Sequence, residues 1–172
     1  MGAGEGEIGA DDHVKPIMLT AVGSGRVLNL AAPGVTTVLI CFAQDTQKGI
    51  EAPESAVRER WPEAHTVLVG HVIDLTKVPG LFRKIAEGVL SNEYRKAVAA
   101  LPEDQVSAPD DYVVMFPDWS GEVVQAFGIA DPNVAMSCIV LSKNGRVLAT
   151  CSDQETRDRD LVAAVAKALE EA

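Results

Sequence analysis

The alternation of apolar and polar positions divides the chain into short strands and amphipathic helices. Two short apolar runs flank a glycine-rich turn at 23–25, a pattern typical of a β-hairpin. Residues 36–42 are almost continuously apolar, as expected for a strand buried on both faces. Apolar side chains then recur at helical spacing over 51–61, and a further apolar run follows at 65–74. This order predicts a β-α-β unit with parallel strands and a right-handed crossover.

The next segment has the periodicity of helices. Apolar residues four apart predict two helices between Leu81 and Leu101, with Ser91 as the N-cap of the second. A third strand is expected at 112–116, followed by a short helix that Ser120 caps. The apolar stripes of the two long helices are formed by Leu81, Ile85 and Val89, and by Tyr94, Val98 and Leu101.

The last third of the chain predicts a second hairpin and a closing helix. Asn144 and Gly145 stand between apolar runs at 137–141 and 146–151, and Asn-Gly is the strongest short hairpin signal. Residues 157–171 have the spacing of an amphipathic helix. A parallel unit followed by an antiparallel pair predicts an α/β fold with a mixed sheet and helices on both faces.

Composition narrows the function classes. We expect one domain at 15–172 behind a flexible acidic tail at 1–14, since a domain usually takes about 100–200 residues. The net charge of −10 argues against nucleic acid and anionic membranes as partners. No apolar run approaches the ~20 residues that span a bilayer, and the N-terminus lacks the features of a secretory signal. Three widely spaced cysteines favour a reducing cytoplasm, and we expect no cofactor and no metal.

Three segments carry a likeness to a known superfamily. They are the strand and turn Val38–Pro53, the stretch Phe116–Ile129, and the strand and turn Cys138–Val147. Together they resemble the thioredoxin-like superfamily, in the redoxin branch of peroxiredoxins and thiol–disulfide oxidoreductases. The resemblance implies a thioredoxin-like fold: a mixed central sheet flanked by helices, an N-terminal β-hairpin and a two-helix insertion.

The chain departs from that family where its chemistry resides. With Pro53 as the anchor, the two redox cysteine positions fall on Asp45 and Lys48. The peroxidatic cysteine and the arginine of the peroxidases are also missing. Met136 stands nearest to the family's cis-proline, so we expect a trans peptide bond there. The resemblance therefore implies a redox-inactive protein, which we expect to act as a binding or interaction module.

A candidate ligand cleft remains at the former redox site. Ligands of open α/β sheets bind beyond the carboxyl ends of the parallel strands. The start of the helix near Glu51 would add backbone N–H groups for a small polar or anionic ligand, unless Asp45 or Thr46 simply caps it. The residues expected at this edge are Gln44, Asp45, Thr46, Gln47, Lys48, Asp74, Thr76 and Met136.

Two enzymatic alternatives stay open. Cys41 and Cys138 are expected on neighbouring antiparallel strands, where they would serve a thiol redox enzyme or sensor. Against this, buried cysteines commonly pack as small apolar side chains. The other alternative is a non-redox enzyme that uses the cleft around Asp45 and Lys48.

A protein interface is a further hypothesis. Basic side chains gather in the helical region after position 77, where they would form a docking face for an acidic protein or for a second copy in a homodimer. The competing interpretation is a merely solvated helix face. Trp119 would add an exposed aromatic anchor or else cover the edge of the core. The basic residues are Lys77, Arg83, Lys84, Arg95 and Lys96.

Overall fold

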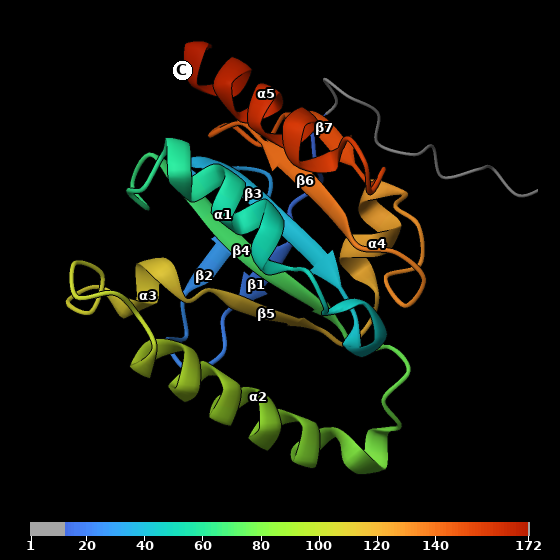
Figure 1. Ribbon diagram of the computed structural model, residues 1–172. Coiled ribbons are helices and arrows are strands. Elements are labelled where there is room, and N and C mark those ends of the chain that lie inside the picture. Colours follow the sequence, from blue (N-terminus) through green and yellow to red (C-terminus); the bar gives the residue numbers. More distant parts are fainter. Residues whose placement is uncertain (1–12, 172) are drawn as a thin grey trace, which may run out of the picture.

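A five-stranded mixed sheet forms the centre of the molecule (Figure 1). The computed structural model describes residues 13–171, so most of the predicted tail lies outside the described residues. The strand order is β5-β4-β3-β6-β7; β3, β4 and β5 run parallel, and β6 is antiparallel to both of its neighbours. The strands are β3 (Thr36–Phe42), β4 (Val67–Asp74), β5 (Met115–Asp118), β6 (Ser137–Leu141) and β7 (Val147–Cys151).

The predicted β-α-β unit is confirmed as β3, α1 (Glu51–Arg60) and β4. All seven residues of β3 are buried, which explains its unbroken apolar run. In α1, Pro53 is tolerated because it lies in the first turn, and Val57 is buried one turn further along.

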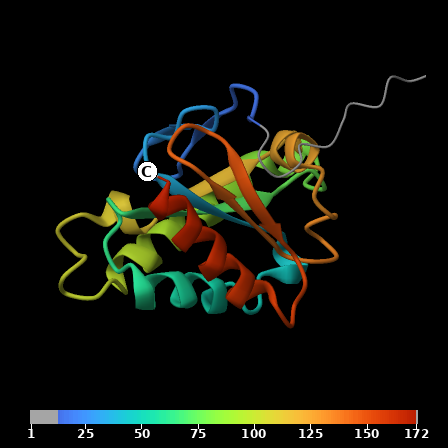
Figure 2. The same cartoon turned by 90° about the horizontal axis from the view of Figure 1, so that it is seen from above.

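Two apolar layers cover the sheet (Figure 2). On one face, α1 and α5 (Arg157–Glu170) pack side by side over alternate residues of β3, such as Val38 and Ile40. On the other face, α4 (Glu122–Phe127) and the hairpin of β1 (Met18–Thr20) and β2 (Val27–Asn29) pack over Leu39 and Cys41. The alternation along β3 thus decides which cluster each side chain joins.

The two predicted hairpins are confirmed, and the second also holds the start of the described chain. Gly145 adopts a φ of +82°, and a Cβ there would stand 2.2 Å from the carbonyl oxygen of Ala31. The N–H of Val14 donates to the carbonyl oxygen of Gly145 at 3.2 Å, and Val14 is 5% exposed. His13 and Val14, at the end of the segment expected as a tail, therefore contact the folded domain.

The inserted region differs in detail from its prediction. A short 3-10 turn η2 (Gly80–Phe82) leads into one continuous helix α2 (Arg83–Ala99). Ser91 lies in the middle of α2 and caps nothing, because no proline interrupts the helical segment around it. The chain then forms a single helical turn, α3 (Pro109–Tyr112), so the third strand begins at Met115 and not at Tyr112.

Candidate functional site

The corner after β3 is closed by hydrogen bonds to a distant loop. The chain turns through η1 (Gln44–Thr46). The hydroxyl of Thr46 accepts a hydrogen bond from the N–H of Ala43 at 2.9 Å and donates one to the carbonyl oxygen of Pro132. Thr46 therefore ties this corner to the loop that precedes β6.

The end of β4 holds the same loop. One carboxylate oxygen of Asp74 accepts from the N–H of Thr76 at 2.9 Å, and the other accepts from the side-chain amide of Asn133 at 3.2 Å. Lys77 adds an ion pair to Asp131 at 3.9 Å. Hydrogen bonds from Asn133, with a smaller effect of Lys77, hold the pKa of Asp131 below its usual value. The loop is thus fixed at both parallel strands whose ends it crosses.

The structure brings together only part of the predicted cleft. Asp74 and Thr76 line a cavity of about 430 Å³, together with Ser120 and Asp131. Met136 is buried in the cluster under α1 and α5 instead of facing a cleft. Four further predicted residues are exposed and do not line this cavity: Gln44, Asp45, Gln47 and Lys48.

The two helix starts near this edge already carry carboxylates. The N-cap of α1 is Ile50, so neither Asp45 nor Thr46 caps that helix. The reason is the turn over 48–50, which separates η1 from α1. Glu51 and Glu54 occupy the first turn of α1, where their negative charge meets the positive end of the helix dipole.

The carboxylate of Asp118 caps the N-terminus of α4. Its carboxylate accepts hydrogen bonds from the N–H groups of Gly121, Glu122 and Val123 at 3.0, 3.2 and 3.2 Å. Asp118 is 4% exposed, whereas Ser120, the predicted cap, is exposed. Gly121 has a φ of +75°, which turns the backbone N–H groups back toward Asp118. The cap is therefore the carboxylate before the turn and not the hydroxyl within it.

Cys41 and Cys138 do not form the predicted pair. In the antiparallel register of β3 and β6, Cys41 lies opposite Ser137 and Cys138 lies opposite Ile40. Side chains of successive residues point to opposite faces of a sheet, so the two thiols belong to different clusters. Burial raises the pKa of Cys138 to about 12 and raises that of Cys41 even further. Neither thiol is exposed as a nucleophile requires.

An apolar stripe on η2 and α2 faces solvent. Leu81, Ile85 and Val89, each four residues apart, are 85%, 64% and 56% exposed, and Phe82 beside them is 49% exposed. We call these four residues the α2 stripe. The helix packs through another side, because Leu90, at 8% exposed, is the buried residue of α2.

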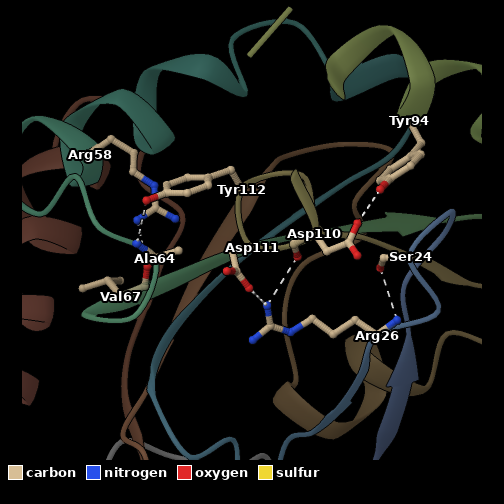
Figure 3. A network of polar contacts seen from close by, with 9 residues as sticks. All are labelled: Ser24, Arg26, Arg58, Ala64, Val67, Tyr94, Asp110, Asp111 and Tyr112. Carbon is tan, nitrogen blue, oxygen red and sulfur yellow. Dashed lines mark hydrogen bonds and ion pairs between the residues drawn. The ribbon is translucent and has the colours of Figure 1, made fainter. Parts of the chain in front are cut away.

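The C-terminal half of α2 is anchored to α3 (Figure 3). The hydroxyl of Tyr94 donates to Asp110 at 2.7 Å, and this bond is the largest of the effects that raise the pKa of Tyr94 to about 12. Arg26 of the first hairpin pairs with Asp111 at 3.1 Å. The Tyr94 ring lies against Gly23, where a Cβ would meet it at 2.2 Å. The side chain of Tyr94 therefore clamps α2 to both α3 and the hairpin.

Further contacts hold α3 and the N-terminal end of α2 in place. Arg58 of α1 lies over the Tyr112 ring at 5.4 Å and donates to the carbonyl oxygen of Val67 at 2.8 Å. At the N-terminal end of α2, Arg83 lies 4.6 Å from the centre of the Trp119 ring. Trp119 is half-buried beneath this cation and is not an exposed anchor. The helix is held at both ends while its stripe points away from the domain.

Most of the basic residues of the predicted docking face have partners. Arg83 pairs with Glu87 at 3.3 Å, and Lys96 pairs with Glu93 at 3.0 Å. Lys84 and Arg95 are exposed, and neither has a hydrogen-bond or ion-pair partner in the described part of the chain, residues 13–171. These two are the basic side chains of α2 that remain available to a partner.

Comparison with solved structures identifies the architecture. An uncharacterized conserved protein from Geobacillus kaustophilus matches with a TM-score of 0.63 and 12% identity, over 95% of this chain and 84% of that chain. The exposed lipoprotein thioredoxin Etrx1 from Streptococcus pneumoniae matches with a TM-score of 0.55 and 17% identity, over 92% and 100%. The protein has a thioredoxin-like fold. A thioredoxin-like protein from Aeropyrum pernix matches with a TM-score of 0.54 and 13% identity, over 91% and 89%. The sequence matches no protein-family model and no curated protein.

The two positions that the family resemblance assigns to redox cysteines hold an acid and a base instead. Asp45 lies in η1 and Lys48 in the turn before α1, both exposed. No peptide bond between residues 13 and 171 is cis, so the trans bond expected at Met136 is confirmed. Over the same residues, no helix is long and apolar enough to cross a membrane, and no three metal-ligating side chains gather. The solvent exposure of the α2 stripe and the role of Asp118 as a cap are the features that sequence reasoning missed.

Proposed function

We propose that this protein is a redox-inactive thioredoxin-fold interaction module that docks a protein partner through the α2 stripe. The exposure of Leu81, Phe82, Ile85 and Val89 on one side of η2 and α2 carries this proposal. Scattered exposed apolar residues are ordinary, but a contiguous row of large ones is typical of an interaction surface.

The stripe is preorganised for binding. Arg83 holds one end of α2 against Trp119, and Tyr94 holds the other part against Asp110 and Gly23. A helix that is already fixed loses little conformational entropy when a partner covers it. This supports a groove or helix of the partner packing along α2, in the manner of helix recognition by apolar anchors one turn apart.

The partner we propose is an acidic amphipathic segment of another protein. Lys84 and Arg95 are eleven residues apart, which is about three helical turns, so they lie on one side of α2 beside the stripe. The α2 helix of a second copy of this chain is a less suitable partner for these two positive charges. Both carboxylates of α2, Glu87 and Glu93, already pair within the helix, so another α2 offers Lys84 and Arg95 no free carboxylate.

The alternatives find less support in the geometry. Cys41 and Cys138 are buried on opposite faces of the sheet, which disfavours a dithiol enzyme or sensor built on them. Asp45 and Lys48 are exposed and do not line the cavity beside Asp74, which disfavours an enzyme built on that pair. The negative groups at the starts of α1 and α4 disfavour an anionic ligand. We place the protein in the cytoplasm, on the three widely spaced cysteines that form no disulfide framework.

The docking proposal is tested with a synthetic helical peptide that carries leucines on one face and glutamates on both flanks. Its binding is followed by fluorescence anisotropy. We expect saturable binding to the full chain, loss of binding in Ile85→Ser/Val89→Ser, and weaker binding in Lys84→Glu/Arg95→Glu. Val106→Ser is the matched control, because Val106 is 54% exposed but lies outside α2. A peptide with lysines in place of the glutamates should not bind.

Three outcomes would overturn the proposal. One is binding that the stripe variant leaves intact, and another is the absence of any binding. The third is a dimer in light scattering that the stripe variant dissociates, which would assign the stripe to a second copy. The redox-inactive part is tested separately by insulin reduction and peroxide consumption, both expected to be absent. Turnover that Cys41→Ser abolishes would contradict it.

A further inference from the structure

Cys138 and Cys151 are direct cross-strand neighbours. In the antiparallel register of β6 and β7, Cys138 lies opposite Cys151. Both side chains belong to the cluster under α1 and α5, so they point to the same face of the sheet. The Cα atoms of opposed antiparallel residues are about 4.5 or 5.5 Å apart, depending on the hydrogen-bonding pattern. Disulfides join Cα atoms about 4.4–6.8 Å apart, so either pattern places these two thiols within bonding reach.

We propose that Cys138 and Cys151 form a reversible cross-strand disulfide when the protein meets an oxidising small-molecule disulfide such as oxidised glutathione. The modification is independent of the α2 stripe and of the corner after β3. It covalently closes the open end of the β6–β7 hairpin, opposite the Asn144-Gly145 turn. Cys41 is excluded as a partner because it lies on the other face of the sheet.

The fold indicates which thiol reacts first. β7 is an edge strand, Cys151 is its last residue, and an exposed segment at 152–155 follows it. Cys138 lies on β6 between β3 and β7 and is 0% exposed, whereas Cys151 is 7% exposed. Fraying of the strand end therefore uncovers Cys151 before Cys138. Arg157, buried at the start of α5, lowers the pKa of both thiols and opposes part of the increase that burial causes.

The reaction balances as two thiol–disulfide exchanges. The thiolate of Cys151 attacks one sulfur of the oxidant, forms a mixed disulfide and releases the first thiolate of the oxidant. The thiolate of Cys138 then attacks the Sγ atom of Cys151 and expels the second thiolate. The protein loses two protons and two electrons, and the oxidant gains them as two free thiols. Reduced glutathione in excess reverses both steps.

Peptide mapping of the full chain tests this pairing. After treatment with oxidised glutathione, the protein is denatured in iodoacetamide and digested with trypsin without reductant. Trypsin places the three cysteines in separate peptides, residues 27–48, 97–143 and 147–157. We expect a covalent link between residues 97–143 and 147–157, together with an alkylated Cys41. Dithiothreitol should abolish the link.

Two variants sharpen the result. Cys41→Ser should give the same linked peptides as the natural sequence, and Cys151→Ser should give none. Oxidation should raise the urea midpoint of unfolding in the natural sequence and in Cys41→Ser, but not in Cys151→Ser. A link that includes Cys41 would overturn the proposal. So would a glutathione adduct that stays on Cys151 without forming the link, or three fully alkylated cysteines after prolonged oxidation in urea below the unfolding transition.

Discussion

The hydroxyl of Thr46 donates a hydrogen bond to the carbonyl oxygen of Pro132, 86 residues further along the chain. The hydroxyl oxygen of Thr46 also accepts a hydrogen bond from the N–H of Ala43, so this one side chain joins the end of β3 to the loop before β6. In this thioredoxin-like fold, that contact closes the corner to which the family resemblance assigns a redox pair. Thr46 thus has a structural role in a place where the sequence suggests a ligand.

Replacing Thr46 tests this role. Thr46→Val keeps the shape of the side chain and removes both hydrogen bonds, so we expect the free energy of unfolding to fall by about 1–2 kcal/mol. Thr46→Ser keeps the hydroxyl and is the matched control, with a clearly smaller loss. Urea denaturation measures both. Equal stability of the two variants would show that the hydroxyl contributes nothing to closing the corner.

Asp118 and Ser120 provide a second matched pair. Asp118→Ala removes a buried carboxylate that accepts three backbone N–H bonds, whereas Ser120→Ala changes an exposed side chain. Loss of a helix cap costs about 0.5–2 kcal/mol, and bonds to a charged group lie at the upper end. We expect the free energy of unfolding, measured by thermal or urea denaturation, to fall by about 2 kcal/mol in Asp118→Ala and by less than about 0.5 kcal/mol in Ser120→Ala. Similar losses of unfolding free energy in the two variants would indicate that Ser120 contributes to the cap as much as Asp118 does.

The buried and exposed sides of α2 should contribute differently to the stability of the protein. Leu90 is 8% exposed and Ile85 is 64% exposed, although both lie on the same helix. Leu90→Ala leaves a cavity and should cost about 2–3 kcal/mol. Ile85→Ser should change the free energy of unfolding by less than about 0.5 kcal/mol, because no buried contact is lost. A large loss in Ile85→Ser would mean that the stripe packs against the domain.

Strand β3 and the final hairpin show where sequence reasoning succeeds. β3 is recognisable because a strand buried on both faces reads as an unbroken apolar run. The final hairpin is recognisable because Asn144-Gly145, between two apolar runs, has a strong local preference for a tight turn. The mixed thioredoxin-like sheet follows from the order of such elements.

The errors have a common physical origin. Helical periodicity detects apolar faces but not which face packs, and α2 has both an outward stripe at Leu81, Ile85 and Val89 and an inward residue at Leu90. The closing contact of Thr46 depends on a backbone oxygen far away in the sequence. The thiol pairing depends on register, and a shift of one residue moves a side chain to the other face.

The bond between Tyr94 and Asp110 predicts a change at high pH. The pKa of Tyr94 is raised from 10.0 to about 12, first by its hydrogen bond to Asp110. A raised pKa in the folded state stabilises the protein fully below the unfolded value of 10.0, and this contribution is lost as the pH rises through about 12. The phenolate absorbance of the natural sequence minus that of Tyr94→Phe isolates this titration. Asp110→Ala should move it back toward 10; an unchanged titration would contradict the role of Asp110.

The burial of the three thiols predicts slow and ordered alkylation in the native state. Burial raises the pKa of Cys138 to about 12, and the pKa values of Cys41 and Cys151 are raised by the same cause. Only the thiolate reacts with iodoacetamide, so modification at neutral pH should be far slower than in urea-unfolded protein. We expect Cys151 to react first, because it ends the edge strand β7. Mass mapping over time checks the order, and a fast reaction at Cys41 would instead reveal an accessible thiol beneath the β3 corner and favour a redox function.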